Sequence, residues 1–181
     1  MGTHQHKGMT FDLPDRWVDR TVVAFSAPPQ ADVPKEHLPN VVMTREALAE
    51  GDTLRTHADK TLLEMAKQLD GFDILESRET VLAGLRAVHI RFKWTSSFGD
   101  LEQGMTMCES PPEPEDSGRF ATLITTSAHA KVAAQAQPVF EQVLSSFRFT
   151  DRGGLPPTPG GVPPAPTPSL PDSPVFGGRR R

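Results

Sequence analysis

The sequence contains a single cysteine, Cys108, among its 181 residues. One cysteine excludes an intramolecular disulfide framework, so nothing in the chain requires an oxidising compartment. No apolar run approaches the roughly 20 residues that a membrane-spanning helix needs. The amino terminus also lacks the positively charged start and continuous apolar stretch of a signal peptide. We therefore expect a soluble, cytoplasmic protein without stable membrane insertion.

Positive charge and catalytic motifs are scarce as well. The formal net charge is −4, and no cluster of Lys and Arg occurs within residues 1–150. Because neutralising phosphates needs such a cluster, we expect no nucleic-acid partner. The chain has no recognisable phosphate loop, nucleophile elbow, zinc-ligand pair or dinucleotide fingerprint. These absences predict a protein that is not an enzyme and that holds no cofactor or metal.

A few residues capable of chemistry remain, and each has a simpler interpretation. His4 and His6 have no third or fourth metal ligand nearby in the sequence, which favours a solvated pair over a metal site. His89 stands on the polar side of its segment, so we interpret it as solvated or partner-facing rather than as a catalytic base. The apolar surroundings of Cys108 predict a buried, inert core residue rather than a nucleophile.

Two charged groups are also interpreted as solvated. Four carboxylates gather in and beside a proline-rich loop, but their spacing offers too few carbonyl ligands for a calcium site. They are Glu109, Glu113, Glu115 and Asp116. The Arg179–Arg181 triplet follows two glycines and is interpreted as solvated. The alternative is that it contacts an acidic surface.

The composition changes sharply near Asp151. Beyond this point the chain carries half of its 18 prolines and only scattered large apolar side chains. Such a stretch cannot offset a backbone entropy cost of roughly 1–2 kcal/mol per residue. We predict a flexible terminus at residues 1–8, a folded domain at 9–149 and a disordered proline- and glycine-rich tail at 150–181.

The first half of the domain predicts two strands and a helix. β-type runs at 21–25 and 40–44 are separated by a proline-bearing loop, which suits neighbouring strands without a tight hairpin. Asp52 or Thr53 can cap a helix that Gly71 ends. Its apolar residues recur at helical spacing and are Leu54, Ala58, Leu62, Ala66 and Leu69.

The second half changes to a period of two. Apolar and polar residues alternate through 87–94, which predicts a strand buried on one face. Further strands are expected at 101–109 and 120–126. The last element is a helix whose final segment is 138–147, with Pro138 near its first turn. Its extension upstream through 130–136 stays open. The order predicts an α+β fold in which helices pack on one face of an antiparallel sheet and leave a concave opposite face.

Several strand residues expected on that opposite face are too apolar for water. They are Val22, Ala24, Val42, Leu101 and Met105. Such a face indicates a binding groove or a dimer interface. The alternative is that helices or a crossing strand cover it.

Five segments carry a resemblance to a known family. They are Phe11–Thr21 (FxLPDxWxDxT), Gln68–Phe72 (QLxGF), the strand that closes in Trp94, Asp100–Leu101, and Leu123–Thr126. Their order and spacing resemble the Eag chaperones of the DcrB-like group over about residues 9–149. The resemblance implies a PsbP-like fold and a cytoplasmic homodimer without enzymatic activity.

The resemblance also implies a client. Eag chaperones hold the amino-terminal transmembrane helices of type VI secretion effectors of the PAAR or Rhs type until loading on the VgrG spike. Matching strand to strand places the effector-binding positions at Val22, Ala24, Val42, Thr44, Leu101, Gln103 and Met105. The expected function is that of an effector chaperone, and the alternative is a DcrB-like ligand- or partner-binding domain unrelated to secretion.

Overall fold

The computed structural model describes residues 2–6, 9–13, 22–29, 33–112 and 118–149. No helix within these ranges is long and apolar enough to cross a membrane. In chain order the elements are β1 (Gly2–His6), β2 (Met9–Leu13), β3 (Val23–Ser26), the 3-10 helix η1 (Lys35–His37), β4 (Asn40–Ala47), α1 (Leu54–Gln68), β5 (Asp73–Leu82), β6 (Leu85–Ser96), β7 (Gly99–Glu109), β8 (Phe120–His129) and α2 (Ala130–Ser146).

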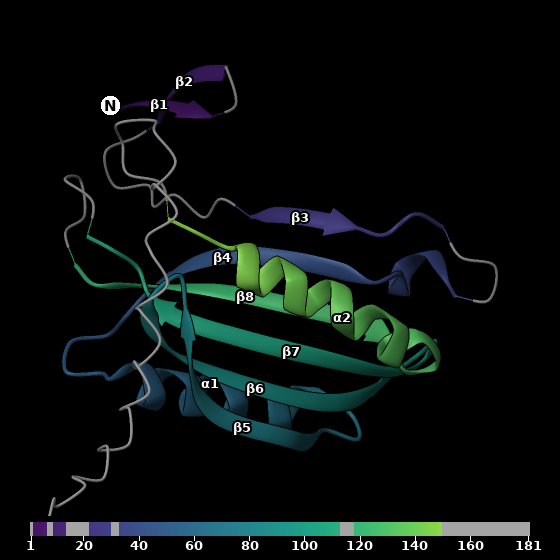
Figure 1. Ribbon diagram of the computed structural model, residues 1–181. Helices are drawn as coiled ribbons and strands as arrows, with labels where there is room; N and C mark the ends of the chain where they lie inside the picture. Colours follow the sequence, from purple (N-terminus) through teal and green to yellow (C-terminus); the bar gives the residue numbers. More distant parts are fainter. Residues whose placement is uncertain (1, 7–8, 14–21, 30–32, 113–117, 150–181) are drawn as a thin grey trace, which may run out of the picture. The chain divides into compact units, whose positions relative to one another are not determined.

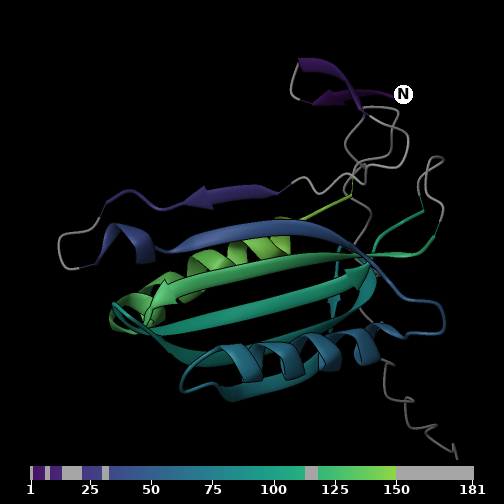
Figure 2. The same cartoon turned by 180° about the vertical axis from the view of Figure 1, so that it is seen from behind.

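Six strands form one antiparallel sheet in the order β3-β4-β8-β7-β6-β5 (Figures 1 and 2). Strands β5 to β8 follow one another as a meander, and β4 pairs with β8 on the far side. The neighbouring pair β3 and β4 is joined by a long connection, as predicted. The α+β class with an antiparallel sheet is confirmed.

The two amino-terminal strands form a separate two-stranded sheet. The register runs from Gly2 opposite Leu13 to His6 opposite Met9. Residues 2–6 therefore have regular structure where the sequence predicted a flexible terminus. The predicted tail at 150–181 lies outside the described residues.

Helix α1 begins and ends where the sequence predicted. The Thr53 hydroxyl accepts a hydrogen bond from the Thr56 N–H at 3.1 Å, which satisfies one of the free donors of the first turn. Ala58 and Leu62 are the buried residues of its sheet-facing side. The chain leaves the helix through Gly71, whose φ of 62° favours glycine.

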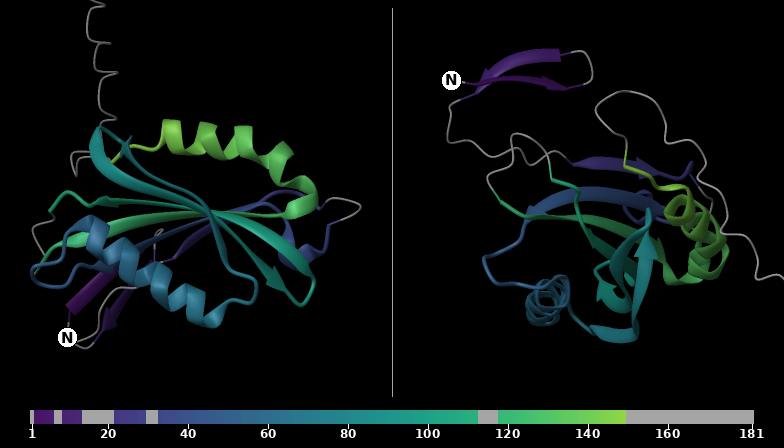
Figure 3. Two further views of the ribbon diagram at one scale, coloured as in Figure 1. Left: turned by 90° about the horizontal axis from the view of Figure 1, so that it is seen from below. Right: turned by 60° about the vertical axis from the view of Figure 1, so that its left-hand side comes forward.

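The two helices lie on opposite faces of the sheet (Figure 3). Helix α1 packs on the side of β6 that carries Ile90 and Phe92, whereas α2 packs on the side of Ala87. Successive strand residues point to opposite faces, so these two sets cannot share a face. The predicted placement of both helices on one face is therefore corrected. The second face accepts α2 because its central residues, such as Ala87 and Cys108, are small and buried.

Helix α2 extends eight residues upstream of Pro138. His129 caps it, with its Nδ1 accepting from the Lys131 N–H at 3.2 Å. The prediction that Pro138 stands near the first turn is wrong, because an alanine-rich segment continues the helix from Ala130. Proline lacks the N–H that would bond the Ala134 carbonyl. Both residues are exposed, so water can reach this carbonyl.

Candidate functional site

Six of the seven residues predicted to bind an effector lie on the α1 face of the sheet, and the seventh, Val22, precedes β3. Ala24 pairs with Val42, Val42 with Thr125, and Thr125 with Met105. Directly paired residues point to the same face, and Met105 belongs to the core beneath α1. Alternation along the strands adds Thr44, Leu101 and Gln103 to this face. The structure therefore places residues from three strands on one face, but α1 packs on that face, which the sequence had predicted to be free of helices.

Burial along this face falls from β7 towards β3. Met105 has no exposed surface and Leu101 is only 3% exposed. Neither side chain can contact an external ligand in this conformation, so their predicted role in binding stays untested and requires the face to open. The other five predicted residues are half-buried or exposed. We call them the α1-face strip, defined by Val22, Ala24, Val42, Thr44 and Gln103.

The amide of Gln103 has a fixed orientation. Its Oε1 accepts a hydrogen bond from Trp94 Nε1 at 2.8 Å. The indole nitrogen can only donate, so the accepting atom must be the amide oxygen. Trp94 in turn packs against the core beneath α1. The Gln103 amide nitrogen therefore keeps its two N–H donors for a bound group.

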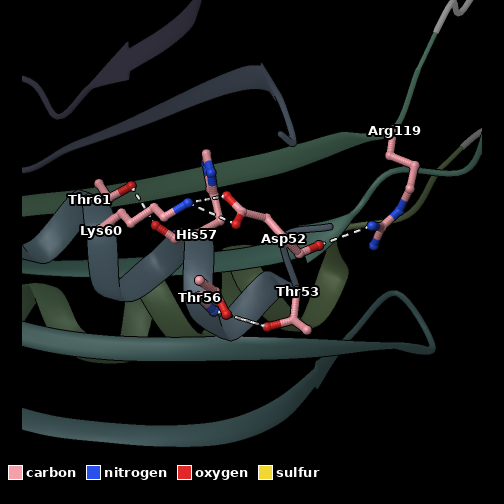
Figure 4. A network of polar contacts seen from close by, with 7 residues as sticks. All are labelled: Asp52, Thr53, Thr56, His57, Lys60, Thr61 and Arg119. Carbon is pink, nitrogen blue, oxygen red and sulfur yellow. Dashed lines mark hydrogen bonds and ion pairs between the residues drawn. The ribbon is translucent and has the colours of Figure 1, made fainter. Parts of the chain in front are cut away.

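A polar network fixes the start of α1 beside this face (Figure 4). Lys60 Nζ lies 2.8 Å from each carboxylate oxygen of Asp52. Arg119 Nη1 donates to the Asp52 carbonyl at 3.0 Å, and its guanidinium also binds both carboxylate oxygens of Glu109. These bonds connect the helix to the ends of β7 and β8. The network thus fixes the start of α1 on the sheet face that carries the strip.

The opposite face buries the two residues whose chemistry was in question. His89 is buried, and its Nδ1 lies 2.8 Å from Thr106 Oγ1. The prediction of a solvated or partner-facing His89 is wrong, because α2 covers this face. Burial, and next the nearby positive charge of Arg78, lower the pKa of His89. Cys108 is confirmed as a buried core residue, and burial raises its pKa to about 11, which makes it a poor nucleophile.

The buried His89 predicts a loss of stability in mild acid. Its pKa in the folded chain lies below the ordinary value of 6.5, so the unfolded chain binds the proton more readily. The stabilising contribution of neutral His89 is complete above pH 6.5 and falls as the pH decreases towards the folded pKa. Urea unfolding from about pH 8 to about pH 5 should show this loss in the wild type, whereas His89→Gln, which does not titrate, should show a smaller one. Equal pH dependence in the two proteins would contradict the assignment.

The remaining candidates contribute no site among the described residues. Glu109 binds Arg119, and this hydrogen bond lowers the pKa of Glu109. The loop carboxylates Glu113, Glu115 and Asp116 and the Arg179–Arg181 triplet lie outside the described ranges. His4 and His6 fall within β1. Within the part of the chain that the structure describes, no three His, Cys, Asp or Glu side chains are grouped to hold a metal ion.

Sequence reasoning missed a groove between α2 and β3. It has a volume of about 430 Å³, and apolar side chains such as Phe25 and Val139 line it. The sequence analysis did not predict the groove, because it did not decide whether the last helix extends through 130–136. A signal was present, since Val132, Ala136, Val139 and Val143 recur at spacings of four, three and four residues.

Among the solved structures that share this fold are two with TM-scores above 0.5. The first is PA94 from Pseudomonas aeruginosa, a protein of unknown function, with a TM-score of 0.66 and 18% identity over 83% of this chain and 98% of that chain. The second is LpqN, involved in cell envelope biogenesis of Mycobacterium tuberculosis, with a TM-score of 0.54 and 11% identity over 75% of this chain and 88% of that chain. The solution structure of cyanobacterial PsbP from Synechocystis sp. PCC 6803 overlays less well, with a TM-score of 0.45 and 10% identity over 78% of this chain and 86% of that chain.

Likeness at such low identity shows the fold alone. No curated protein matches the chain. The family comparison is more specific, because the DcrB family model matches residues 9–146, which include every element from β2 to α2. This protein therefore belongs to the DcrB family.

Proposed function

We propose that this protein is a chaperone that shields the amino-terminal transmembrane helices of a type VI secretion effector of the PAAR or Rhs type before loading on the VgrG spike. Membership of the DcrB family and the resemblance to Eag chaperones support the proposal. The observation that carries it is the α1-face strip. Its five residues are uncharged, and the four that lie in strands share the sheet face on which α1 packs.

The strip suits an apolar helix. A transmembrane helix exposes apolar surface on all sides, and each Å² removed from water contributes roughly 25 cal/mol. The small side chain of Ala24 permits close approach of a helix, as small residues do between helices in bilayers. Thr44 and the free amide donors of Gln103 offer hydrogen bonds to polar groups of the client.

One strip contacts only one side of such a helix. The opposite side of the client helix must also be shielded by an apolar protein surface, because exposed apolar surface favours aggregation. A second copy of the chain would supply an identical strip, so the proposal includes a homodimer. The mass of the purified complex in light scattering tests this, with two chaperone chains per client expected and one chain contradicting it.

Charged residues in the strip should abolish client binding. We expect Val22→Glu and Val42→Glu to lower recovery of a co-expressed effector about ten-fold or more, equivalent to about 1.4 kcal/mol, because each brings an unpaired carboxylate against an apolar helix. The client is the amino-terminal region of an Rhs or PAAR effector encoded beside this gene. Recovery is measured by co-purification from the soluble fraction.

Val81→Glu serves as the matched control, since Val81 is 67% exposed on β5 at the other edge of the sheet. It should bind like the wild type. If the two strip variants fold and still recover the client normally, the strip is not the binding surface. If the wild type leaves the client insoluble, the chaperone proposal fails and the DcrB-like domain unrelated to secretion replaces it.

A further inference from the structure

We propose that the groove between α2 and β3 docks one uncharged apolar helix, as a second binding surface on the sheet face opposite the α1-face strip. The inference rests on the proposed function for the source of this helix, which would be a second apolar segment of the same client. It differs from that function in the surface used, the residues involved and the variants that test it.

Within the described part of the chain, the topology leaves this groove open. Helix α2 packs mainly over β8 and β7, and β3 is an edge strand beyond β4. Phe25 pairs with Val41, and Val41 belongs to the core beneath α2, so Phe25 points to the α2 face. The floor is closed by the buried side chains of Val41 and Phe140, whereas Phe25 and Val139 at the sides are 61% and 58% exposed.

The lining restricts the charge of the occupant. Among the residues that the structure describes, 12 line the groove and none of these is charged, although Asp, Glu, Lys and Arg make up 23% of the chain. The same sheet face beyond α2 differs, because Arg91 there lies 3.3 Å from Glu102 and Lys93 lies 3.3 Å from Asp73. A charged occupant would lose its hydration in the groove without gaining an ionic partner. The complementary occupant is therefore uncharged where it contacts the lining.

The spacing along α2 points to a helix as the occupant. Val132, Ala136, Val139 and Val143 all line the groove, and their four-three-four spacing forms one apolar stripe. This is the spacing through which one helix packs along another. Ala136 is buried in the core beneath α2, so an occupant would contact the exposed Val139 and the half-buried Val132 and Val143. An extended peptide would instead be expected to pair with the outer edge of β3.

The probe is a synthetic Leu/Ala helix of about 20 residues with lysines at both ends, a length that spans the apolar core of a bilayer. The full chain is tested for the amount of peptide that it keeps in solution after centrifugation. We expect Val139→Glu to lower this amount about five-fold or more and Val81→Glu, at a similarly exposed position, to leave it unchanged. A photo-crosslinking residue at position 139 should attach to the peptide.

The outcomes separate this inference from the proposed function. Loss of binding in Val139→Glu together with crosslinking to the peptide supports the groove, whatever Val22→Glu does. Normal binding in Val139→Glu with loss in Val22→Glu overturns the groove and leaves the chaperone proposal standing. A crosslink from position 139 to a second copy of the chain also overturns it, because the groove would then be an interface between copies.

Discussion

Replacing Phe92 by alanine should lower the free energy of unfolding by about 3–5 kcal/mol. The Phe92 side chain has no exposed surface, and its ring centroid lies 5.1 Å from that of Phe72. It belongs to the core between the sheet and α1, so its removal leaves a cavity that the surrounding strands can fill only in part. A loss of this size is a large share of the 5–15 kcal/mol that stabilises a typical domain.

Urea unfolding followed by circular dichroism measures this loss. Phe98→Ala is the matched control, because it removes the same ring from a side chain that is 57% exposed in the β6–β7 turn. The control should change the free energy of unfolding by less than about 1 kcal/mol. If Phe92→Ala prevents folding, Phe92→Leu should still fold with a smaller loss. A Phe92→Ala protein no less stable than Phe98→Ala would contradict the assigned core.

The sequence predicts this core because both of its elements have clear periods. Ile90 and Phe92 alternate with polar residues along β6, and Ala58 and Leu62 recur at helical spacing along α1. In both β6 and α1 the regular spacing arises because one face of the element is buried and the other is exposed or polar. The cap at Thr53 and the exit through Gly71 then place both ends of the helix.

Periodicity does not predict the burial of His89 on the α2 face, and it does not predict the edge strand β5. Alternation in β6 assigns His89 to a polar face, but a polar side chain can be buried when it finds a partner, as His89 does in Thr106. Strand β5 was missed because it is an edge strand in which Ile74 and Val81 remain exposed. An irregular register between Ile74 and Glu76 also breaks its period of two.

For the predicted binding residues, the alternation of the sequence predicts the sheet face but not the depth of burial. Alternation decides which face a strand residue occupies, and it placed Ala24, Val42 and Met105 on one face. It does not decide depth, because depth depends on how far α1 extends across the sheet. Met105 lies in the core beneath that helix, whereas Ala24 is two strands beyond β8 and exposed. Whether the exposed members bind a client stays a prediction.

Replacing Pro138 by alanine should raise the free energy of unfolding by about 2–3 kcal/mol. Pro138 stands inside α2, where it removes the hydrogen bond to the Ala134 carbonyl and its ring crowds the preceding turn. Alanine restores the N–H donor and fits a helix interior. The gain is reduced in part because proline also restricts the unfolded chain, by roughly 0.4–1 kcal/mol.

Gln142→Ala provides the control for this change, since Gln142 is exposed on the same helix and its backbone N–H is already present. Its effect should stay within about 0.5 kcal/mol. The two variants are compared by urea unfolding in the full chain. Lower stability in Pro138→Ala would contradict the expected gain and would mean that α2 packs across β8 and β7 better with proline at this position.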